Sequence, residues 1–159
     1  MKAAVLTVSD GVAARTRKDE SGELLATLLA ADGYEVERRA VADDVDEIAH
    51  AVMVLAAYLP LVLTTGGTGV APRDVTPEAT ASVLDRVAPG ISEAIRADAI
   101  AKTPHGLLSR GIAGVRGTTL VVNLPGSTGG CRDGYSVLRP ALEHALRLLS
   151  GETTEHVQT

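Results

Sequence analysis

Two aspartates stand where their carboxylates could do chemistry. Asp43 comes at the end of one predicted strand, and Asp74 follows residues 64–69 (TTGGTG), the loop that ends another. Two carboxylates facing a crevice that binds phosphate are typical of a magnesium site, because Mg²⁺ is held by one or two carboxylates together with substrate phosphates. Each acid also has an ordinary local role. Asp43 could help to start the next helix, and Asp74 could close an Asx turn before Thr76.

Two glycine-rich loops follow the same pattern, in which an apolar strand runs into glycines and hydroxyl side chains. Residues 61–69 read LVLTTGGTG, and residues 120–130 read LVVNLPGSTGG. Glycine lets backbone N–H groups approach an anion closely, and serine or threonine hydroxyls add further donors. Because the carboxyl ends of parallel strands share one edge of a sheet, we expect both loops and Asp10, at the end of a third strand, to converge on one pocket. A purely connecting role for these loops is the alternative.

The familiar phosphate-binding and catalytic motifs are missing from the sequence. It has no Gly-Lys pair for a Walker A loop, no third glycine after Gly67 and Gly69 for a dinucleotide fingerprint, and no serine spaced as in a nucleophile elbow. Its four histidines are scattered, which gives little support to a Ser-His-Asp or zinc site. Asp19, in the segment KDESG, is interpreted as a further polar contact or a helix cap. Three arginines could offset phosphate charge: Arg73, Arg110 and Arg132.

The elements that must position these residues alternate between strands and helices. Apolar runs predict strands over residues 3–10, 34–41, 61–65, 111–117 and 118–126. Helical spacing predicts helices over residues 21–33, 43–59, 76–87 (with Thr76 as N-cap), 89–102 and 135–151, with a polar loop before the first of them. We therefore predict an α/β protein, a three-layer α/β/α sandwich with a mainly parallel sheet. Residues 1–150 form its single domain, and residues 151–159 form a polar tail.

Composition and charge narrow the class of protein. The chain has 159 residues, of which 45% are hydrophobic but only 2% aromatic, so the core must consist of Ala, Val, Leu and Ile. A net charge of −5 argues against a nucleic-acid partner. The single cysteine, Cys131, excludes an intrachain disulfide and a multi-cysteine zinc site. Because no signal segment or membrane-spanning run is recognised, we expect a soluble, cytoplasmic protein without a membrane partner.

Several motifs in this order resemble the MoaB/Mog family of molybdenum-cofactor biosynthesis. They are VSD at 8–10, DESG at 19–22, TTGGTG at 64–69, RDVTPEAT at 73–80, LSRGIAGVRG at 108–117 and NLPGS at 123–127. The resemblance implies a molybdopterin-binding α/β/α fold and a homotrimer or dimer of trimers. It also implies transfer of AMP from Mg-ATP to the terminal phosphate of molybdopterin, with adenylyl-molybdopterin and pyrophosphate as products. Other proteins of molybdenum-cofactor biosynthesis would be further partners.

The resemblance also assigns roles to individual residues. Asp43 and Asp74 match acids implicated in magnesium-dependent catalysis, so they are the candidate catalytic and Mg²⁺-binding residues. The candidate substrate-binding residues are Ser9, Asp10, Asp19, Thr65, Gly66, Gly67, Thr68, Gly69, Pro125, Gly126 and Ser127. Two alternatives use the same loops. One is an inactive molybdopterin-binding carrier or scaffold, which would need neither acid, and the other is a regulator that binds a free nucleotide.

Overall fold

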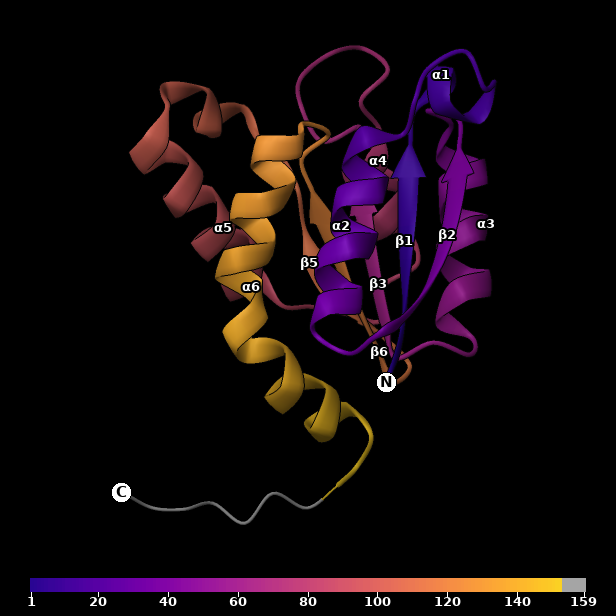
Figure 1. Ribbon diagram of the computed structural model, residues 1–159, viewed down its shortest axis with the longest axis vertical. Helices are drawn as coiled ribbons and strands as arrows, with labels where there is room; N and C mark the ends of the chain where they lie inside the picture. The colour runs from indigo at the N-terminus through magenta and orange to yellow at the C-terminus, as the bar shows by residue number, and fades with distance from the viewer. Residues whose placement is uncertain (153–159) are drawn as a thin grey trace.

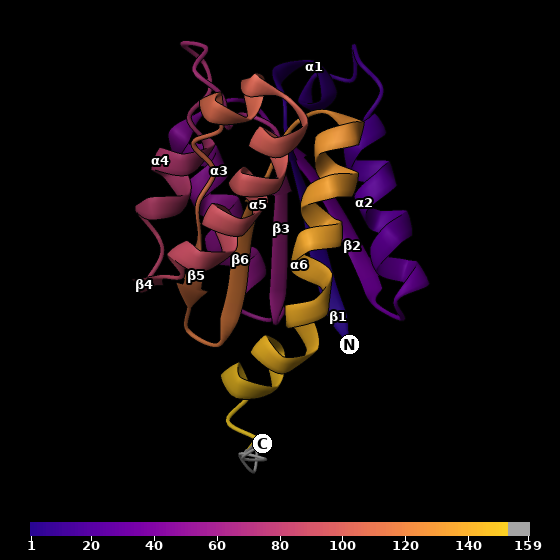
Figure 2. The same ribbon diagram turned by 90° about the vertical axis from the view of Figure 1, so that its left-hand side faces the viewer.

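A six-stranded sheet with the order β2-β1-β3-β6-β5-β4 lies between two layers of helices in the computed structural model, which describes residues 1–152 (Figures 1 and 2). The strands are β1 (Lys2–Val8), β2 (Glu35–Val41), β3 (Leu61–Thr65), β4 (Arg86–Val87), β5 (Ala113–Arg116) and β6 (Thr119–Leu124). Strands β2, β1, β3 and β6 are parallel, whereas β5 is antiparallel to β6 and β4 is antiparallel to β5.

Helices cover both faces of this sheet. They are α1 (Asp10–Ala13), α2 (Glu20–Ala31), α3 (Val45–Ala56), α4 (Thr76–Ala81), α5 (Pro89–Lys102), the 3₁₀ helix η1 (Pro104–Leu108) and α6 (Thr128–Leu149). Helices α2, α5 and α6 lie on one face, and α3 and α4 lie on the other (Figure 2). The predicted three-layer α/β/α sandwich with a mainly parallel sheet is confirmed. No helix in residues 1–152 is long and apolar enough to cross a membrane.

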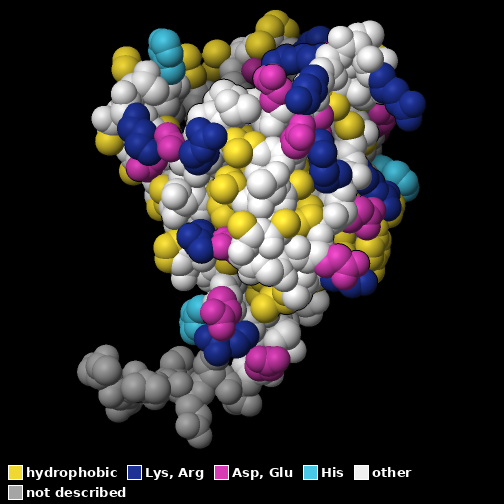
Figure 3. Space-filling model, viewed as in Figure 1, with side chains coloured by type: hydrophobic (Ala, Val, Ile, Leu, Met, Phe, Trp, Pro, Cys, Tyr) yellow, Lys and Arg dark blue, Asp and Glu magenta, His cyan; other side chains and the backbone are white. Residues whose placement is uncertain are grey.

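Alternate residues of the central strands enter the two halves of the core. In β1, Ala3 and Val5 pack with α2 and α6, whereas Ala4 and Leu6 pack with α3. Burial on both faces explains why β1, β3 and β6 read as continuous apolar runs. Over α2 and α6, hydrophobic side chains also reach the surface and are surrounded by charged ones (Figure 3).

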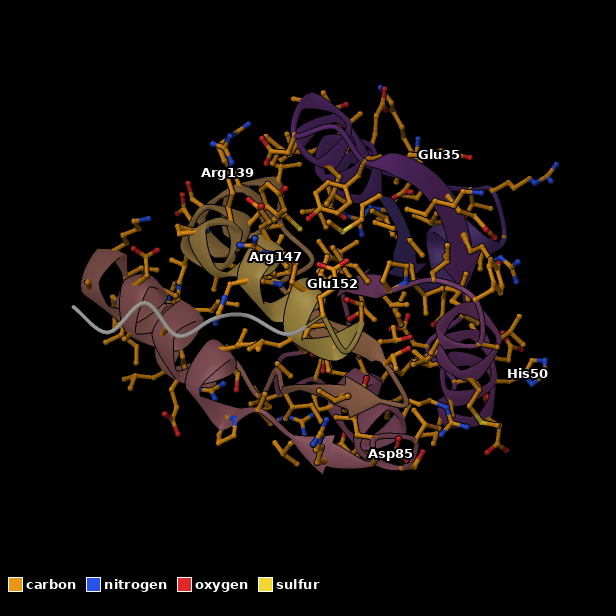
Figure 4. The ribbon with its side chains drawn as sticks, turned by 90° about the horizontal axis from the view of Figure 1, so that it is seen from below. Glu35, His50, Asp85, Arg139, Arg147 and Glu152 are labelled. Carbon is orange, nitrogen blue, oxygen red and sulfur yellow. The ribbon has the colours of Figure 1, made fainter. Side chains whose placement is uncertain are left out.

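Strands β1, β2, β3 and β6 all end at one edge of the sheet, the upper edge in Figure 1. Because these strands are parallel, the loops that follow them gather there. The opposite end of the molecule, seen from below in Figure 4, carries Glu35 and Asp85 at its rim.

Three sequence predictions need correction. The helix predicted over 76–87 ends at Ala81, and Arg86–Val87 forms the edge strand β4 because its backbone pairs with β5. The last helix begins at Thr128 rather than at 135. It includes Gly134, whose missing side chain lets α6 approach Leu124 closely. Ser9 and Asp10 do not end a strand. Ser9 caps the one-turn helix α1, which lies where the sequence predicts a loop. Residues 153–159 of the predicted tail lie outside the described residues.

Candidate active site

Two adjacent pockets open at the edge of the sheet where the parallel strands end. The first has a volume of about 530 Å³, and most of the predicted site residues line it: Ser9, Asp19, Asp43, Thr65, Gly66, Gly67, Asp74, Gly126 and Ser127. The second, of about 600 Å³, is lined by Thr68, Gly69 and Pro125, together with apolar side chains such as Ile95 and Leu108. Gly67, Asp74, Gly126 and Ser127 line both, so the pockets share a wall made of the two glycine-rich loops.

Four consecutive carbonyl groups of the TTGGTG loop are bonded to the protein. Thr76 donates from its hydroxyl to the Gly66 oxygen (2.8 Å) and from its backbone N–H to the Gly67 oxygen (3.0 Å). Arg110 donates from its backbone N–H to the Thr68 oxygen (2.8 Å) and from Nε to the Gly69 oxygen (2.7 Å). The hydroxyl of Thr76 is therefore not the N-cap that the sequence predicts, because it bonds to the preceding loop instead.

These carbonyl contacts leave backbone N–H groups of the TTGGTG loop free to bind a ligand. In a trans peptide, the N–H of one residue points away from the C=O of the residue before it. With their carbonyls held by Thr76 and Arg110, the loop's N–H groups turn the other way. Within residues 1–152, the N–H groups of Gly67, Thr68 and Gly69 donate no hydrogen bond. Consecutive free N–H groups form an anion-binding concavity.

The glycines are required for different reasons. Gly66 and Gly67 have φ angles of 99° and 65°, which side chains of L-residues rarely adopt. A Cβ atom at Gly67 would also overlap the hydroxyl of Thr76. At Gly69 the constraint is space, because a Cβ atom would lie 2.8 Å from the Asp74 carboxylate. A Cβ atom at Gly126 would lie 3.2 Å from the Gly66 Cα, which shows how closely the two loops approach each other.

Asp43 is fixed by Asp10. The Asp10 N–H donates to Asp43 Oδ2 (2.9 Å), and the Asp43 N–H donates to Asp10 Oδ1 (3.0 Å). Arg73 donates two hydrogen bonds to the Asp10 carboxylate, from Nε at 2.6 Å and from Nη2 at 2.9 Å. The Arg73 guanidinium, followed by the Asp43 N–H, holds the pKa of Asp10 below its usual value. Asp10 therefore positions Asp43 instead of lining either pocket, and Arg73 is occupied by this ion pair.

Asp74 is fixed by its own turn. Its Oδ2 accepts from the Ala71 N–H, three residues earlier, at 3.0 Å. This is not the Asx turn predicted before Thr76, because an Asx turn bonds the N–H two residues later, and the Thr76 N–H donates to the Gly67 oxygen instead. Asp43 Oδ1 and Asp74 Oδ1 accept no hydrogen bond from residues 1–152. Each carboxylate therefore combines a structural oxygen with one available for a ligand at the first pocket.

Asp19 and Thr65 line the first pocket but are bonded to the protein. Asp19 caps α2 through the Gly22 N–H, accepts from the Thr7 hydroxyl and pairs with Arg38 at 2.8 Å. The helix-cap interpretation of Asp19 is therefore confirmed. The Thr65 hydroxyl lies 2.8 Å from the Pro125 carbonyl oxygen and joins β3 to the second loop.

The sequence prediction missed several residues of the first pocket. Arg17 and Lys18 line it and bring positive charge, although they precede Asp19 directly and could have been noticed as a cationic pair. It also missed the N-terminus of α6, where Ser127 caps the helix by accepting from the Gly130 N–H. Free N–H groups and the helix dipole favour an anion at such a terminus. Arg132 lies outside both pockets.

Comparison with known proteins agrees with this geometry. The family model described as "Probable molybdopterin binding domain" matches residues 4–144. The chain belongs to this family. Its resemblance to the MoaB/Mog proteins of molybdenum-cofactor biosynthesis is thereby confirmed.

Relatives of this molybdopterin-binding domain occur alone and within longer proteins. The chain is 34% identical to the molybdopterin adenylyltransferase of Helicobacter pylori strain J99, over 92% of this chain and 86% of that protein. It is 37% identical to the Drosophila melanogaster molybdenum cofactor synthesis protein cinnamon, over 94% of this chain. The match covers 26% of cinnamon and 49% of the bifunctional molybdenum cofactor biosynthesis protein of Chlorobaculum tepidum, so the chain spans less than half the length of these two relatives.

Solved structures of the same family superpose on nearly the whole chain. The molybdopterin biosynthesis enzyme MoaB of Thermus thermophilus is 43% identical with a TM-score of 0.88, covering 97% of this chain and 99% of that one. The Mog protein of Mycobacterium ulcerans is 42% identical with a TM-score of 0.89, covering 93% and 98%.

Proposed function

We propose that this protein is a molybdopterin adenylyltransferase, which transfers AMP from ATP to molybdopterin and releases pyrophosphate. The observation that carries the proposal is the shared wall of the two pockets, since a transfer between two phosphorylated substrates needs two sites whose phosphate ends meet. In the first pocket, Arg17 and Lys18 offer positive charge for phosphate groups. In the second, apolar side chains offer walls for a ring system. Relatives named molybdopterin adenylyltransferase support the same reaction.

The reaction requires positioning and charge neutralisation more than acid–base help from the protein. An oxygen of the molybdopterin phosphate, already ionised near neutral pH, would attack the α-phosphorus of ATP. A new P–O bond forms there, the bond to the β-phosphate oxygen breaks, and pyrophosphate leaves with that electron pair. Free N–H groups of residues 67–69 and the N-terminus of α6 would hold the phosphates at the shared wall.

Asp43 and Asp74 fit a divalent cation that also binds substrate phosphate. Both line the first pocket, and each keeps one oxygen free of protein hydrogen bonds within residues 1–152. This donor set matches Mg²⁺, which takes one or two carboxylates plus phosphate oxygens. When bound, Mg²⁺ would stabilise the charge on the phosphates and on the leaving pyrophosphate. The chain's own contribution is to fix the two carboxylates through Asp10 and Ala71.

An assay of AMP transfer tests the proposal. Purified protein is incubated with Mg²⁺, molybdopterin and ATP labelled in its α-phosphate, and the label is followed into adenylyl-molybdopterin while pyrophosphate is measured. Equal amounts of both products are expected, and neither should form when molybdopterin is omitted. Molybdopterin binding without transfer would instead establish a carrier or scaffold. ATP binding without molybdopterin binding would establish a nucleotide-binding regulator.

A further inference from the structure

The side chain of Arg110 holds both ends of the segment that carries Asp74. Its Nε donates to the Gly69 carbonyl oxygen at 2.7 Å, and its Nη2 donates to the Asp74 carbonyl oxygen at 2.7 Å. Its Nη1 is paired with the carboxylate of Glu78, on the next helix. One guanidinium therefore joins the TTGGTG loop, the Asp74 turn and α4, and it is itself only 37% exposed.

These contacts require the shape of arginine. A guanidinium presents its N–H donors in a rigid plane, so it can bond two carbonyls and a carboxylate from different directions. A lysine ammonium at the end of a flexible stem keeps the charge without this fixed spacing. The backbone on both sides of Arg110 is also fixed. Arg96 Nη1 donates to the carbonyl oxygens of Ser109 (2.8 Å) and Gly111 (3.3 Å), the two chain neighbours of Arg110.

We infer that Arg110 is a positioning residue for the proposed AMP transfer, acting through Gly69 and Asp74. Anchoring the two carbonyls fixes the length and direction of residues 69–74. Inside this segment, the Ala71 N–H orients the Asp74 carboxylate, and a Cβ-free Gly69 lies against it. Arg110 lines neither pocket, so its effect reaches the substrates through the loop and not by contact. The inference rests on the proposed function for its catalytic part.

The test is Arg110→Lys, with Arg116→Lys as the matched control. Arg116 also donates to a backbone carbonyl, that of Val83 at 2.8 Å, but lies at the end of β5 away from both pockets. Single-turnover AMP transfer is measured at several Mg²⁺ concentrations, alongside hydrogen exchange of the backbone amides of residues 66–75. Exchange is followed without substrate or metal, so it does not depend on activity.

Arg110→Lys should slow transfer by about 10²-fold, the effect expected when reacting groups are displaced by about 1 Å. It should also raise the Mg²⁺ concentration giving half-maximal rate and speed exchange in residues 66–75. Arg116→Lys should change none of the three. A variant that only lowers the melting temperature, with wild-type transfer rate, Mg²⁺ dependence and loop exchange in the cold, would overturn the inference.

The test distinguishes a failure of the proposed function from a failure of the role inferred for Arg110. If the wild type transfers no AMP, the proposed function fails. Faster loop exchange in Arg110→Lys would then still establish that Arg110 orders the loop. Unchanged exchange would overturn this ordering role too. If Arg110→Lys does not fold, Arg110→Gln replaces it, because glutamine removes the guanidinium contacts to the Gly69 and Asp74 carbonyls without leaving a buried charge. Faster loop exchange and a raised Mg²⁺ requirement are then expected, and wild-type values for both would refute the role of Arg110.

Discussion

Asp10 and Asp43 each accept a hydrogen bond from the backbone N–H of the other, at 3.0 and 2.9 Å. This reciprocal pair ties the start of α1, just beyond β1, to the loop after β2, although the two residues are far apart in the chain. It also fixes which oxygen of Asp43 is used for structure. The other, Oδ1, faces the TTGGTG loop, since a Cβ atom at Gly67 would lie 3.3 Å from it.

The Asp10–Arg73 ion pair should make this corner of the protein sensitive to acid. The pKa of Asp10 is lower in the folded chain than in the unfolded chain, chiefly because of Arg73. Its contribution to stability is therefore complete above the unfolded pKa of about 3.9 and is lost as the pH falls through the lower folded value. The free energy of unfolding should exceed that of Asp10→Asn at pH 5 to 7, and the difference should shrink below about pH 4. Urea titrations of both proteins measure it. A difference that stays constant into acid would contradict the prediction.

Asp43→Asn and Asp74→Asn should each reduce AMP transfer by about 10²–10³-fold, as the loss of one preorganised electrostatic contact does. Asparagine keeps an oxygen that can accept from the Asp10 or Ala71 N–H, so the loops should hold their shape. Molybdopterin affinity should change much less, because in the proposed site the glycine loops would supply its main contacts. Single-turnover transfer and equilibrium binding separate these effects.

Asp44→Asn is the matched control for both acids. Asp44 is next to Asp43 but caps α3 through the Glu47 N–H at 2.9 Å, and asparagine caps a helix equally well. Transfer by this variant should equal that of the wild type. Full activity in both Asp43→Asn and Asp74→Asn would rule out their catalytic assignment.

The sheet could be predicted because its signal is local. Apolar runs such as 61–65 identify buried parallel strands, and parallel strands place their following loops at one edge. The start of α6 could not be read in the same way. Residues 128–130, with two glycines, have low helix propensity, and their helix is stabilised by the Ser127 cap and by packing that the sequence does not display.

The candidate site was predictable at the level of loops but not of individual contacts. Asp43 and Asp74 both line the first pocket, whereas Thr68, Gly69 and Pro125 line only the second. The roles of Asp10 and Arg110 depend on contacts across tens of residues in the chain. Such pairings arise from tertiary packing, and no local pattern in the sequence signals them.

The assembly remains a prediction from the family resemblance, a homotrimer or a dimer of trimers. Large apolar side chains at Val70, Val87 and Leu107 are more than half exposed and offer surface for such contacts. Light scattering during size-exclusion chromatography should therefore give three or six times the chain mass of 16.4 kDa. A stable single-chain mass at micromolar concentration would exclude the assembly.

Cys131 should resist alkylation in the folded protein. Its thiol is buried, lies 2.9 Å from the Pro125 carbonyl oxygen and 3.1 Å from the Thr65 hydroxyl, and has a pKa raised by burial to about 11. Because the thiolate is the reactive form, little of it exists at pH 8. Iodoacetamide should leave the native protein unmodified at pH 8 and should alkylate it at one site in denaturant. Rapid labelling of the native protein would mean that the second glycine loop opens.

Gly67→Ala should abolish molybdopterin binding, whereas Gly117→Ala should preserve it. Both glycines have left-handed φ angles, 65° and 57°, so alanine should cost roughly 1–2 kcal/mol of backbone strain at either position. They differ in their surroundings. A Cβ atom at Gly117 meets nothing within 4 Å, but at Gly67 it overlaps the Thr76 hydroxyl that bonds the Gly66 carbonyl.

The Gly67 variant must therefore move Thr76 or turn the loop, and either change redirects the free N–H groups that face the pocket. Its free energy of unfolding should fall further than that of Gly117→Ala, because it loses the Thr76 hydrogen bond as well. Calorimetry of molybdopterin binding, well below the melting temperature of both variants, separates ligand contact from stability. If Gly67→Ala is folded and binds molybdopterin as the wild type does, the TTGGTG loop only connects β3 to α4 and the anion site must lie elsewhere.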